Sequence, residues 1–301
     1  MRLNALTLGY AIPENDFKAI IHSAFTSAIN LKLDGSSELI TLVISNETDL
    51  PQGIRVDTPT NFNFDGFQVN DNASCQAGIL RFAGSELEID LTKATHWKCN
   101  FRDLQNEQEP EGFRNSWRIV WQILNDHQIE FKAEIIADSI LRPQEGSTSL
   151  FSQRLNEGIS TIFRSARDLD PHLADDAVST LIGLGSGLTP AGDDFLVGFM
   201  VGLISRLGND RKREIYIAQI GESIQSNFTR TNDISRTYLK HAVHGQVSRN
   251  LAELAEAICG GWTDVRLYER AAATMNSGHS SGMDTITGLL LGLAAWDGKL
   301  I

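Results

Sequence analysis

The chain has 301 residues, a length typical of two domains or one large one, and its 38 Asp and Glu against 26 Lys and Arg give a net charge of −12. With 42% hydrophobic and 21% charged residues, it can bury a sizeable core and is not a disordered chain. The acidic balance argues against nucleic acid and anionic membrane surfaces as partners, because both attract basic patches. Three widely separated cysteines, Cys75, Cys99 and Cys259, predict neither a disulfide scaffold nor a zinc ribbon and favour a reducing compartment.

Neither a signal peptide nor a membrane span is expected. Residues 1–16 lack a basic start followed by an apolar run. The most apolar segment, residues 181–207, is interrupted by Asp193 and Asp194, which a membrane span tolerates badly. We therefore expect a globular protein of the cytoplasm.

The first half of the chain, residues 1–145, is expected to be a β-rich domain. It carries short runs that are β-rich or that alternate apolar and polar residues with the period of half-buried strands, and turn residues separate the runs, a pattern typical of a meander or small barrel. The strands predicted in this way cover residues 38–45, 78–82 and 87–91. Two helices are predicted within the same half, over residues 17–29 and residues 116–124. The domain is expected to end in the polar, turn-rich segment 142–149.

The second half, residues 150–301, is expected to be an all-α domain of about seven helices, because its apolar residues recur with a period near 3.6. Three amphipathic stripes support this prediction: Phe151, Leu155, Ile159 and Phe163; Ile217, Ile220, Ile224 and Phe228; and Leu239, Val243, Val247, Leu251, Leu254 and Ile258. The third stripe predicts one long helix that ends at Gly260 and Gly261. The fold class expected for the chain is therefore α+β.

Two segments of the second half share one glycine–aspartate pattern. Gly192, Asp194, Gly198 and Gly202 recur 90 residues later as Gly282, Asp284, Gly288 and Gly292. In each copy a loop of glycine and hydroxyl residues (GLTPAGDD and GHSSGMD) leads into an apolar helix. Glycines four residues apart lie on one helix face, where another backbone can approach closely. We therefore expect the two helices to cross on their glycine faces and to place their N-terminal loops beside one pocket.

The loops before these helices are candidate anion-binding sites. Glycine-rich loops at helix N-termini expose N–H donors that bind phosphate or carboxylate groups. No Lys-Ser or Lys-Thr pair follows the first loop, so it is not a Walker A loop, and it lacks the third glycine of a dinucleotide fingerprint. The candidate anion-binding residues of the two loops are Gly185, Gly187, Thr189, Gly192, Asp193, Ser280, Ser281 and Gly282.

The candidate catalytic residues are Asp194, Asp284 and His279. The two aspartates hold the same place in the two copies, where they would orient the loops or a substrate amide. His279 lies inside the second loop and would act as a general acid or as a hydrogen-bond partner of the ligand. The alternative is that the aspartates only cap their helices and the glycines only pack them.

A third segment, residues 231–245, opens a helix with several capping residues. Thr231, Ser235 and Arg236 would add hydroxyl groups and a cationic fork to a site for an anionic ligand. An ordinary helix cap with a solvated arginine is the alternative for this segment.

The sequence makes no cofactor certain. Asp193, Asp194 and Asp284 could hold Mg²⁺, which favours carboxylates together with bound phosphate. His241 and His244 permit metal ligation by their spacing, but no third ligand accompanies them at a telling distance. No nucleophile elbow or Ser/His/Asp pattern is visible either.

The glycine–aspartate motifs resemble the AllH-like family. The resemblance rests on residues 183–198 (GLGSGLTPAGDDFLVG), on residues 231–235 and on residues 278–284 (GHSSGMD), and it extends over most of the chain. Ser186 departs from the pattern, because the family is expected to carry proline there. The family is associated with a multi-subunit oxamate carbamoyltransferase of anaerobic allantoin degradation, alongside FdrA-like and other companion subunits.

The resemblance implies phosphorolysis of oxalurate to oxamate and carbamoyl phosphate, or the reverse transfer. Every species in that reaction is a small anion, which two helix N-termini facing one pocket would suit. The alternatives are a non-catalytic structural or ligand-sensing subunit, and a metal-dependent small-molecule hydrolase. Assembly as a homo-oligomer is a further alternative.

Overall fold

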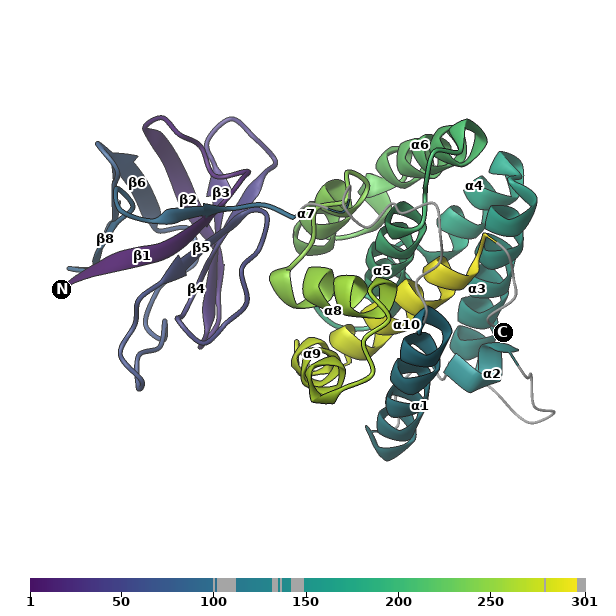
Figure 1. The fold of residues 1–301 in the computed structure, drawn as a ribbon. Helices are drawn as coiled ribbons and strands as arrows, with labels where there is room; N and C mark the ends of the chain where they lie inside the picture. The colour runs from purple at the N-terminus through teal and green to yellow at the C-terminus, as the bar shows by residue number, and fades with distance from the viewer. Residues whose placement is uncertain are drawn as a thin grey trace. The chain divides into compact units, whose positions relative to one another are not determined.

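The computed structural model describes residues 1–99, 101, 112–131, 135, 137–141, 149–278 and 280–296. It divides into two compact units, Met1–Cys99 and Asn100–Ile301 (Figure 1). The first unit is built of strands and the second of helices, so the predicted α+β class is confirmed. The division after Cys99 comes earlier than the end at 142–149 that was expected for the β-rich half. Residues 142–148 of that segment lie outside the described residues.

The first unit is a β-barrel, one of the two arrangements predicted for it. Its strands are β1 (Arg2–Gly9), β2 (Phe17–Ala24), β3 (Ala28–Leu33), β4 (Leu39–Val43), β5 (Gly53–Val56), β6 (Asn72–Gln76), β7 (Ile79–Phe82), β8 (Glu88–Asp90) and β9 (Thr95–Trp97). They follow the order β5-β4-β3-β2-β6-β7-β8-β1-β9, and β1 also pairs with β5, which closes strands β1 to β8 into a ring. β9 pairs in parallel with the end of β1, beyond the residues of β1 that β8 pairs.

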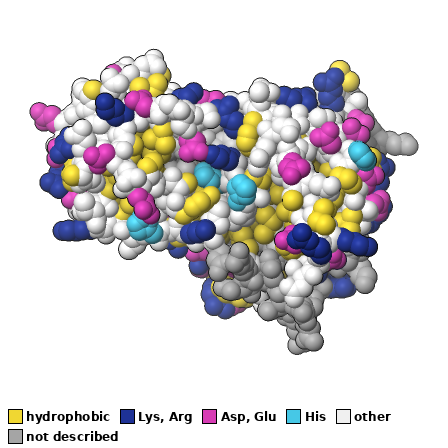
Figure 2. Space-filling model, turned by 90° about the horizontal axis from the view of Figure 1, so that it is seen from above, with side chains coloured by type: hydrophobic (Ala, Val, Ile, Leu, Met, Phe, Trp, Pro, Cys, Tyr) yellow, Lys and Arg dark blue, Asp and Glu magenta, His cyan; other side chains and the backbone are white. Residues whose placement is uncertain are grey.

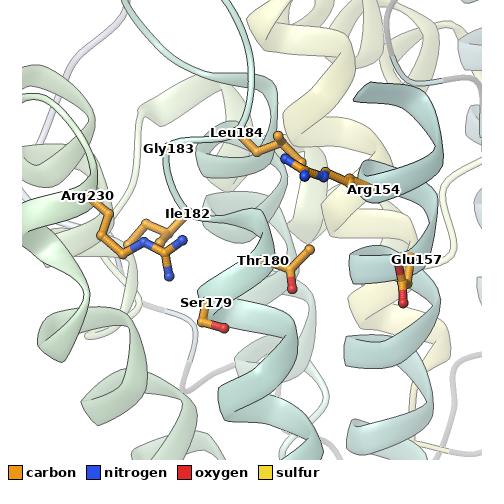
Figure 3. Close-up of a pocket in the computed structure, with 8 residues that line it drawn as sticks. All are labelled: Arg154, Glu157, Ser179, Thr180, Ile182, Gly183, Leu184 and Arg230. Atoms are coloured by element: carbon orange, nitrogen blue, oxygen red, sulfur yellow. The ribbon is translucent and has the colours of Figure 1, made fainter. Parts of the chain in front are cut away.

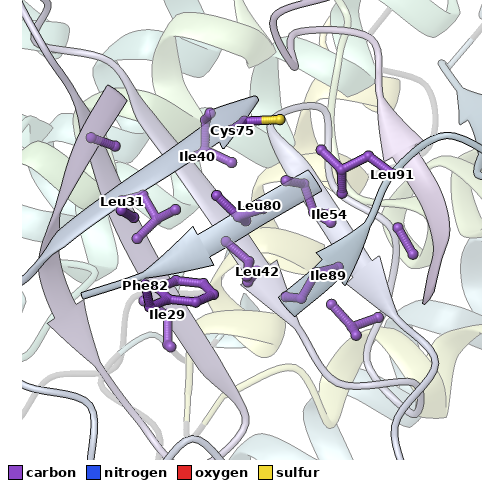
Figure 4. Packing of buried hydrophobic residues seen from close by; sticks show 14 of the residues in the cluster. Ile29, Leu31, Ile40, Leu42, Ile54, Cys75, Leu80, Phe82, Ile89 and Leu91 are labelled. Carbon is purple, nitrogen blue, oxygen red and sulfur yellow. The ribbon is translucent and has the colours of Figure 1, made fainter. Parts of the chain in front are cut away.

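The inside of the barrel is filled by hydrophobic side chains, most of them aliphatic, that several strands contribute (Figure 4). Period-two alternation explains this, since it sends every second side chain to the same face. Leu80 on β7 and Ile89 on β8 are both fully buried. Their neighbours Arg81 and Glu88 form an ion pair of 2.7 Å on the exposed side. The three strands predicted over residues 38–45, 78–82 and 87–91 are confirmed as β4, β7 and β8.

The helix predicted over residues 17–29 is wrong, because this segment forms β2 and β3. Phe25 and Ala28 exchange backbone hydrogen bonds across a tight turn, which makes the two strands a hairpin. Ala19 and Ile21 face the barrel interior, whereas Lys18 is exposed. The apolar residues at helical spacing in this segment are equally compatible with period two, and pairing of β2 with β3 and β6 favours the strand.

The second unit is a bundle of helices. They are α1 (Phe113–Phe131), α2 (Ala137–Leu141), α3 (Leu150–Asp168), α4 (Pro171–Leu181), α5 (Ala191–Ser205), α6 (Arg211–Ser226), the 3₁₀-helix η2 (Phe228–Arg230), α7 (Asp233–Ala242), α8 (Arg249–Cys259), α9 (Val265–Met275) and α10 (Ser281–Ala294). The helix predicted over residues 116–124 lies within α1, and its Trp117 indole N–H donates to the carbonyl O of Leu290 on α10 at 2.8 Å. α1 thus belongs to the helical unit rather than to the β-rich half.

α5 and α10 form the centre of the helical unit. Every residue of α5 except Ile204 is buried, and α10 is buried along most of its length. A helix that is apolar around its whole circumference has no solvent face, so other helices must cover it. α4, α7 and α8 pack against α5, while α1 and α9 pack against α10.

The single long helix predicted from Leu239 to Ile258 is also wrong, because the chain breaks it into α7 and α8. Gly245 adopts a φ of +69° in the turn between them, a conformation that favours glycine. Ser248 then caps the start of α8 with its side chain. The predicted end at Gly260 is confirmed, and the described residues from 149 onward contain eight α-helices where about seven were expected.

The exposed charges, the cysteines and the hydropathy of the helices complete the description of the fold. The face shown in Figure 2 intersperses acidic and basic side chains without a continuous basic patch. The three cysteines are free and buried. Within the described part of the chain, no helix has the length and hydropathy needed to cross a membrane.

Candidate functional site

α5 and α10 pack against each other through glycine. A Cβ atom built on Gly198 would lie under 3.0 Å from the carbonyl O of Thr285, and one on Gly288 would lie equally close to the carbonyl O of Phe195. The residues that approach one another in this way are Gly198, Gly202, Gly288 and Gly292, which we term the glycine seam. Early residues of one helix meet early residues of the other, so the two helices run in the same direction and begin at the same end. The predicted crossing on glycine faces is confirmed.

The loop before α5 contains three glycines with positive φ. Gly183, Gly185 and Gly187 have φ of +72°, +134° and +94°. A Cβ on Gly185 would lie 2.5 Å from the backbone N of Ala191, whereas a Cβ on Gly187 would meet nothing within 4 Å. Close packing and backbone conformation therefore both require glycine at 185, whereas at 187 only the conformation does.

Asp193 fixes this loop to the start of α7. Its side chain is almost fully buried, with 1% of the residue surface exposed. The carboxylate accepts a hydrogen bond from the backbone N–H of Gly183 at 2.7 Å and from the hydroxyl of Thr231 at 2.5 Å. Burial raises the pKa of Asp193, while the bonds from Thr231, Gly183 and Ser235 lower it. Asp193, Thr231 and Ser235, all predicted as anion-binding residues, are thus assembled around one another.

Asp194 lies with two hydroxyl groups where α5 and α10 begin. The Thr189 hydroxyl donates to the Ser281 hydroxyl at 3.3 Å, which links the two loops as predicted. Both hydroxyls also hydrogen-bond to the Asp194 carboxyl group. Asp194 is buried, with 7% of the residue surface exposed. Its Oδ2 atom has no hydrogen-bond partner among the described residues. We term Thr189, Asp194 and Ser281 the carboxyl–hydroxyl cluster.

Burial raises the pKa of Asp194 to about 8. The hydrogen bonds from Ser281 and Thr189 lower the pKa, and the neighbouring charge of Asp193 raises it. Because desolvation disfavours the charged form, the buried carboxyl group keeps its proton at neutral pH. A protonated carboxylic acid donates a hydrogen bond, which an ionised carboxylate cannot do.

Several backbone N–H groups expected to bind an anion are already engaged within the chain. The N–H of Gly192 donates to the carbonyl O of Leu184 at 2.9 Å. The N–H groups of Asp193 and Asp194 both donate to the carbonyl O of Pro190. At these three positions the backbone N–H groups are taken up within the chain, so a ligand there would meet side-chain groups such as those of the carboxyl–hydroxyl cluster.

The corresponding groups of the second loop are engaged as well. Gly282 donates its N–H to the carbonyl O of Ser277, and Asp284 donates to that of Ser280, each at 3.1 Å. A Cβ on Gly282 would lie under 3.0 Å from the carbonyl O of Thr274, so this glycine is required for packing. Asp284 is fully buried in the first turn of α10.

Of the remaining predicted residues, Arg236 is paired within its own helix and His279 is outside the described residues. Arg236 donates from Nη2 to Asp233 at 2.6 Å, an ion pair within the first turn of α7. His279 lies outside the described residues, so its predicted role stays a prediction. Across the described ranges, no three His, Cys, Asp or Glu side chains come together as a metal site.

The structure also contains a cleft beside the first loop that no sequence pattern predicted. It has a volume of about 540 Å³ and is lined by Arg154, Glu157, Ser179, Thr180, Ile182, Gly183, Leu184 and Arg230 (Figure 3). Arg154 lies on α3 next to the apolar stripe, and Arg230 ends η2. No spacing in the sequence connects the two arginines, because they lie on α3 and η2 and only the fold brings them to one cleft.

Two matches to known families cover most of the chain. Residues 181–293 match the family described as oxamate carbamoyltransferase subunit AllH, and residues 4–96 match the family described as the AllH family N-terminal domain. The first range contains the glycine seam and the carboxyl–hydroxyl cluster, and the second covers the barrel strands β1 to β8 except the first two residues of β1. No curated protein and no solved structure matches the chain.

Proposed function

Since the chain belongs to the AllH family, named for a subunit of oxamate carbamoyltransferase, we propose that it supplies that enzyme with a binding site for its small anionic substrates. The observation that carries this proposal is the buried Oδ2 atom of Asp194, which has no hydrogen-bond partner among the described residues. An unsatisfied buried polar atom costs free energy unless a ligand completes its hydrogen bonds. The carboxyl–hydroxyl cluster is therefore the proposed site.

The proposed reaction needs a proton donor, and Asp194 is suited to that role. When oxalurate is phosphorolysed, a phosphate oxygen attacks the carbamoyl carbon and the bond from that carbon to the amide nitrogen breaks. The departing nitrogen takes the proton of Asp194, and the carboxylate regains a proton from the hydrogen phosphate, which leaves carbamoyl phosphate and oxamate. A pKa of about 8 keeps the acid protonated near neutral pH and still lets it release its proton readily.

Thr189 and Ser281 support this role from the two loops. Both hydroxyls contact the carboxyl group and each other, so they hold the acid in one orientation. Both lie at the start of a helix, where the dipole favours negative charge on a bound substrate. The parallel course of α5 and α10 directs the two dipoles to the same place.

A subunit implies companion subunits in a complex. We propose that an FdrA-like chain is one of them, as the motif resemblance implies. Purification of the chain from a native extract, followed by identification of the proteins that remain bound, measures this directly.

The experiment that tests the proposed site is the pH dependence of oxamate binding. Oxamate keeps its carboxylate ionised between about pH 6 and about pH 9, so any change in affinity comes from the protein. We expect the wild-type affinity to fall at least tenfold over this range, because ionised Asp194 would repel the anion. Thermal unfolding reports the binding, since a ligand at one hundred times its Kd adds about 2.7 kcal/mol to the stability.

Asp194→Asn separates binding from proton transfer. The amide still donates a hydrogen bond but does not titrate, so its affinity for oxamate should be nearly constant over the same pH range. In the assembled complex this variant should lose at least 100-fold in turnover, since an amide cannot give up a proton to the leaving nitrogen. Asp126→Asn, an exposed substitution on α1, is the matched control and should behave like the wild type. Equal pH dependence in the wild type and Asp194→Asn would contradict the proposal.

A further inference from the structure

The cleft beside the first loop carries positive charge in an acidic chain. Arg154 and Arg230 extend toward it from opposite sides (Figure 3). Neither guanidinium has an ion-pair partner in the part of the chain that the structure describes, although Glu157 lies three residues from Arg154 on α3. Several arginines elsewhere are paired, as in Arg2–Asp90, Arg55–Asp49, Arg81–Glu88, Arg236–Asp233 and Arg266–Asp264. With 38 acidic residues against 26 basic ones, two unpaired arginines on one cleft indicate a site for an anion.

The other polar groups of the cleft accept hydrogen bonds. The hydroxyls of Ser179 and Thr180 each donate to the carbonyl O of Asp176 at 2.9 Å, so their oxygens are left as acceptors. The carboxylate of Glu157 is an acceptor as well. A ligand that satisfies this lining needs an anionic end for the arginines and N–H or O–H donors for the acceptors.

The backbone beside the cleft has a fixed shape. A Cβ on Gly183 would lie under 3.0 Å from the carbonyl O of Arg230, and Gly183 donates its N–H to Asp193. The volume of about 540 Å³ falls within the range of small-molecule sites. None of the lining residues belongs to the carboxyl–hydroxyl cluster.

We propose that this cleft is a second binding site, for a small carboxylate or phosphate metabolite that also carries N–H or O–H donors. The anionic group lies between Arg154 and Arg230, and the donors face Glu157 and the two hydroxyl oxygens. The site is separate from the carboxyl–hydroxyl cluster and does not depend on the function proposed for it.

Calorimetric titration of the full chain with two matched pairs of probes tests this proposal. N-carbamoylglycine is compared with acetate, and glycerol phosphate with methyl phosphate, all at one ionic strength. N-carbamoylglycine or glycerol phosphate, or both, is expected to bind at least tenfold more tightly than its matched probe with fewer or no hydrogen-bond donors. The carboxylate pair and the phosphate pair then distinguish which anionic group the arginines take. No binding by either donor-bearing probe, or equal binding within both pairs, would overturn the proposal.

Three variants locate the binding. The double variant Arg154→Gln with Arg230→Gln should lower the affinity for the probe at least tenfold. It should keep the wild-type fold, because both side chains are exposed. Arg164→Gln, an exposed substitution on α3 outside the cleft lining, should leave the affinity unchanged. Asp194→Asn should also leave it unchanged. If Asp194→Asn abolishes the binding and the double arginine variant does not, the probe binds at the carboxyl–hydroxyl cluster and the cleft proposal is wrong.

Discussion

The glycine seam and the carboxyl–hydroxyl cluster lie on the same two helices, yet they are built in opposite ways. In the seam, backbone meets backbone with no side chain between, and the contact is close. In the cluster, at the helix starts, a carboxyl group is buried with one oxygen unsatisfied. The seam fixes the geometry of the helices, and that rigidity holds in place a cluster that is costly by itself. A buried polar group left unsatisfied within a well-packed region is typical of functional sites.

The largest expected effect comes from the seam. Gly198→Ala places a Cβ under 3.0 Å from backbone atoms of α10, where no flexible side chain can move aside. We expect the substitution to force the helices apart and to cost more than about 4 kcal/mol, as severe overpacking does. Denaturant unfolding followed by circular dichroism measures the loss.

Gly221→Ala on α6 is the matched control for the seam. A Cβ there would lie 3.5 Å from the Val243 side chain, an ordinary contact. Since alanine is a better helix former than glycine by about 1 kcal/mol, this variant should be as stable as the wild type or more so. A similar loss of stability in both variants would mean that the seam is not closely packed.

An intermediate effect is expected from the cluster, in the pH dependence of stability. The pKa of Asp194 is raised from 3.8 in the unfolded chain to about 8 in the folded one. Between these values the folded chain holds a proton that the unfolded chain has released. The free energy of unfolding therefore falls as pH rises, by about 1.4 kcal/mol per pH unit, and levels off above about pH 8. Burial raises the pKa of Asp193 as well, which adds to the same trend.

Asp194→Asn should remove most of this slope, because the amide carries no proton to release. Unfolding in denaturant at about pH 5, 6, 7 and 8 compares the two chains, with the exposed Asp126→Asn as control. Parallel curves for the wild type and Asp194→Asn would show that Asp194 is ionised in the folded chain. The seam contains no titratable group, so a seam variant that still folds should keep the wild-type slope.

The same contrast explains what the sequence could predict. The seam was predictable from a local rule, since glycines four residues apart share a helix face. Because the seam aligns the two helices, it also predicts that their loops lie together. Residues 17–29 and the segment from Leu239 to Ile258 were mispredicted because pairing with other strands, or one glycine turn, overrode the local period. The cleft of Arg154 and Arg230 was not predictable, because its charges come from helices that only the fold brings together.

The smallest expected effect is Gly187→Ala, in the loop that leads to the cluster. Alanine at φ of +94° is strained, but its Cβ would meet nothing within 4 Å, and the unfolded chain loses some freedom in return. The net cost should be about 1 kcal/mol, or roughly 2–4 °C in Tm. Gly185→Ala should cost more, because its Cβ would also lie 2.5 Å from the backbone N of Ala191. Equal losses of stability in the two variants would show that backbone conformation alone shapes the loop. The expected larger loss for Gly185→Ala means that the close packing of the seam continues into the loop as far as Gly185 and ends before Gly187.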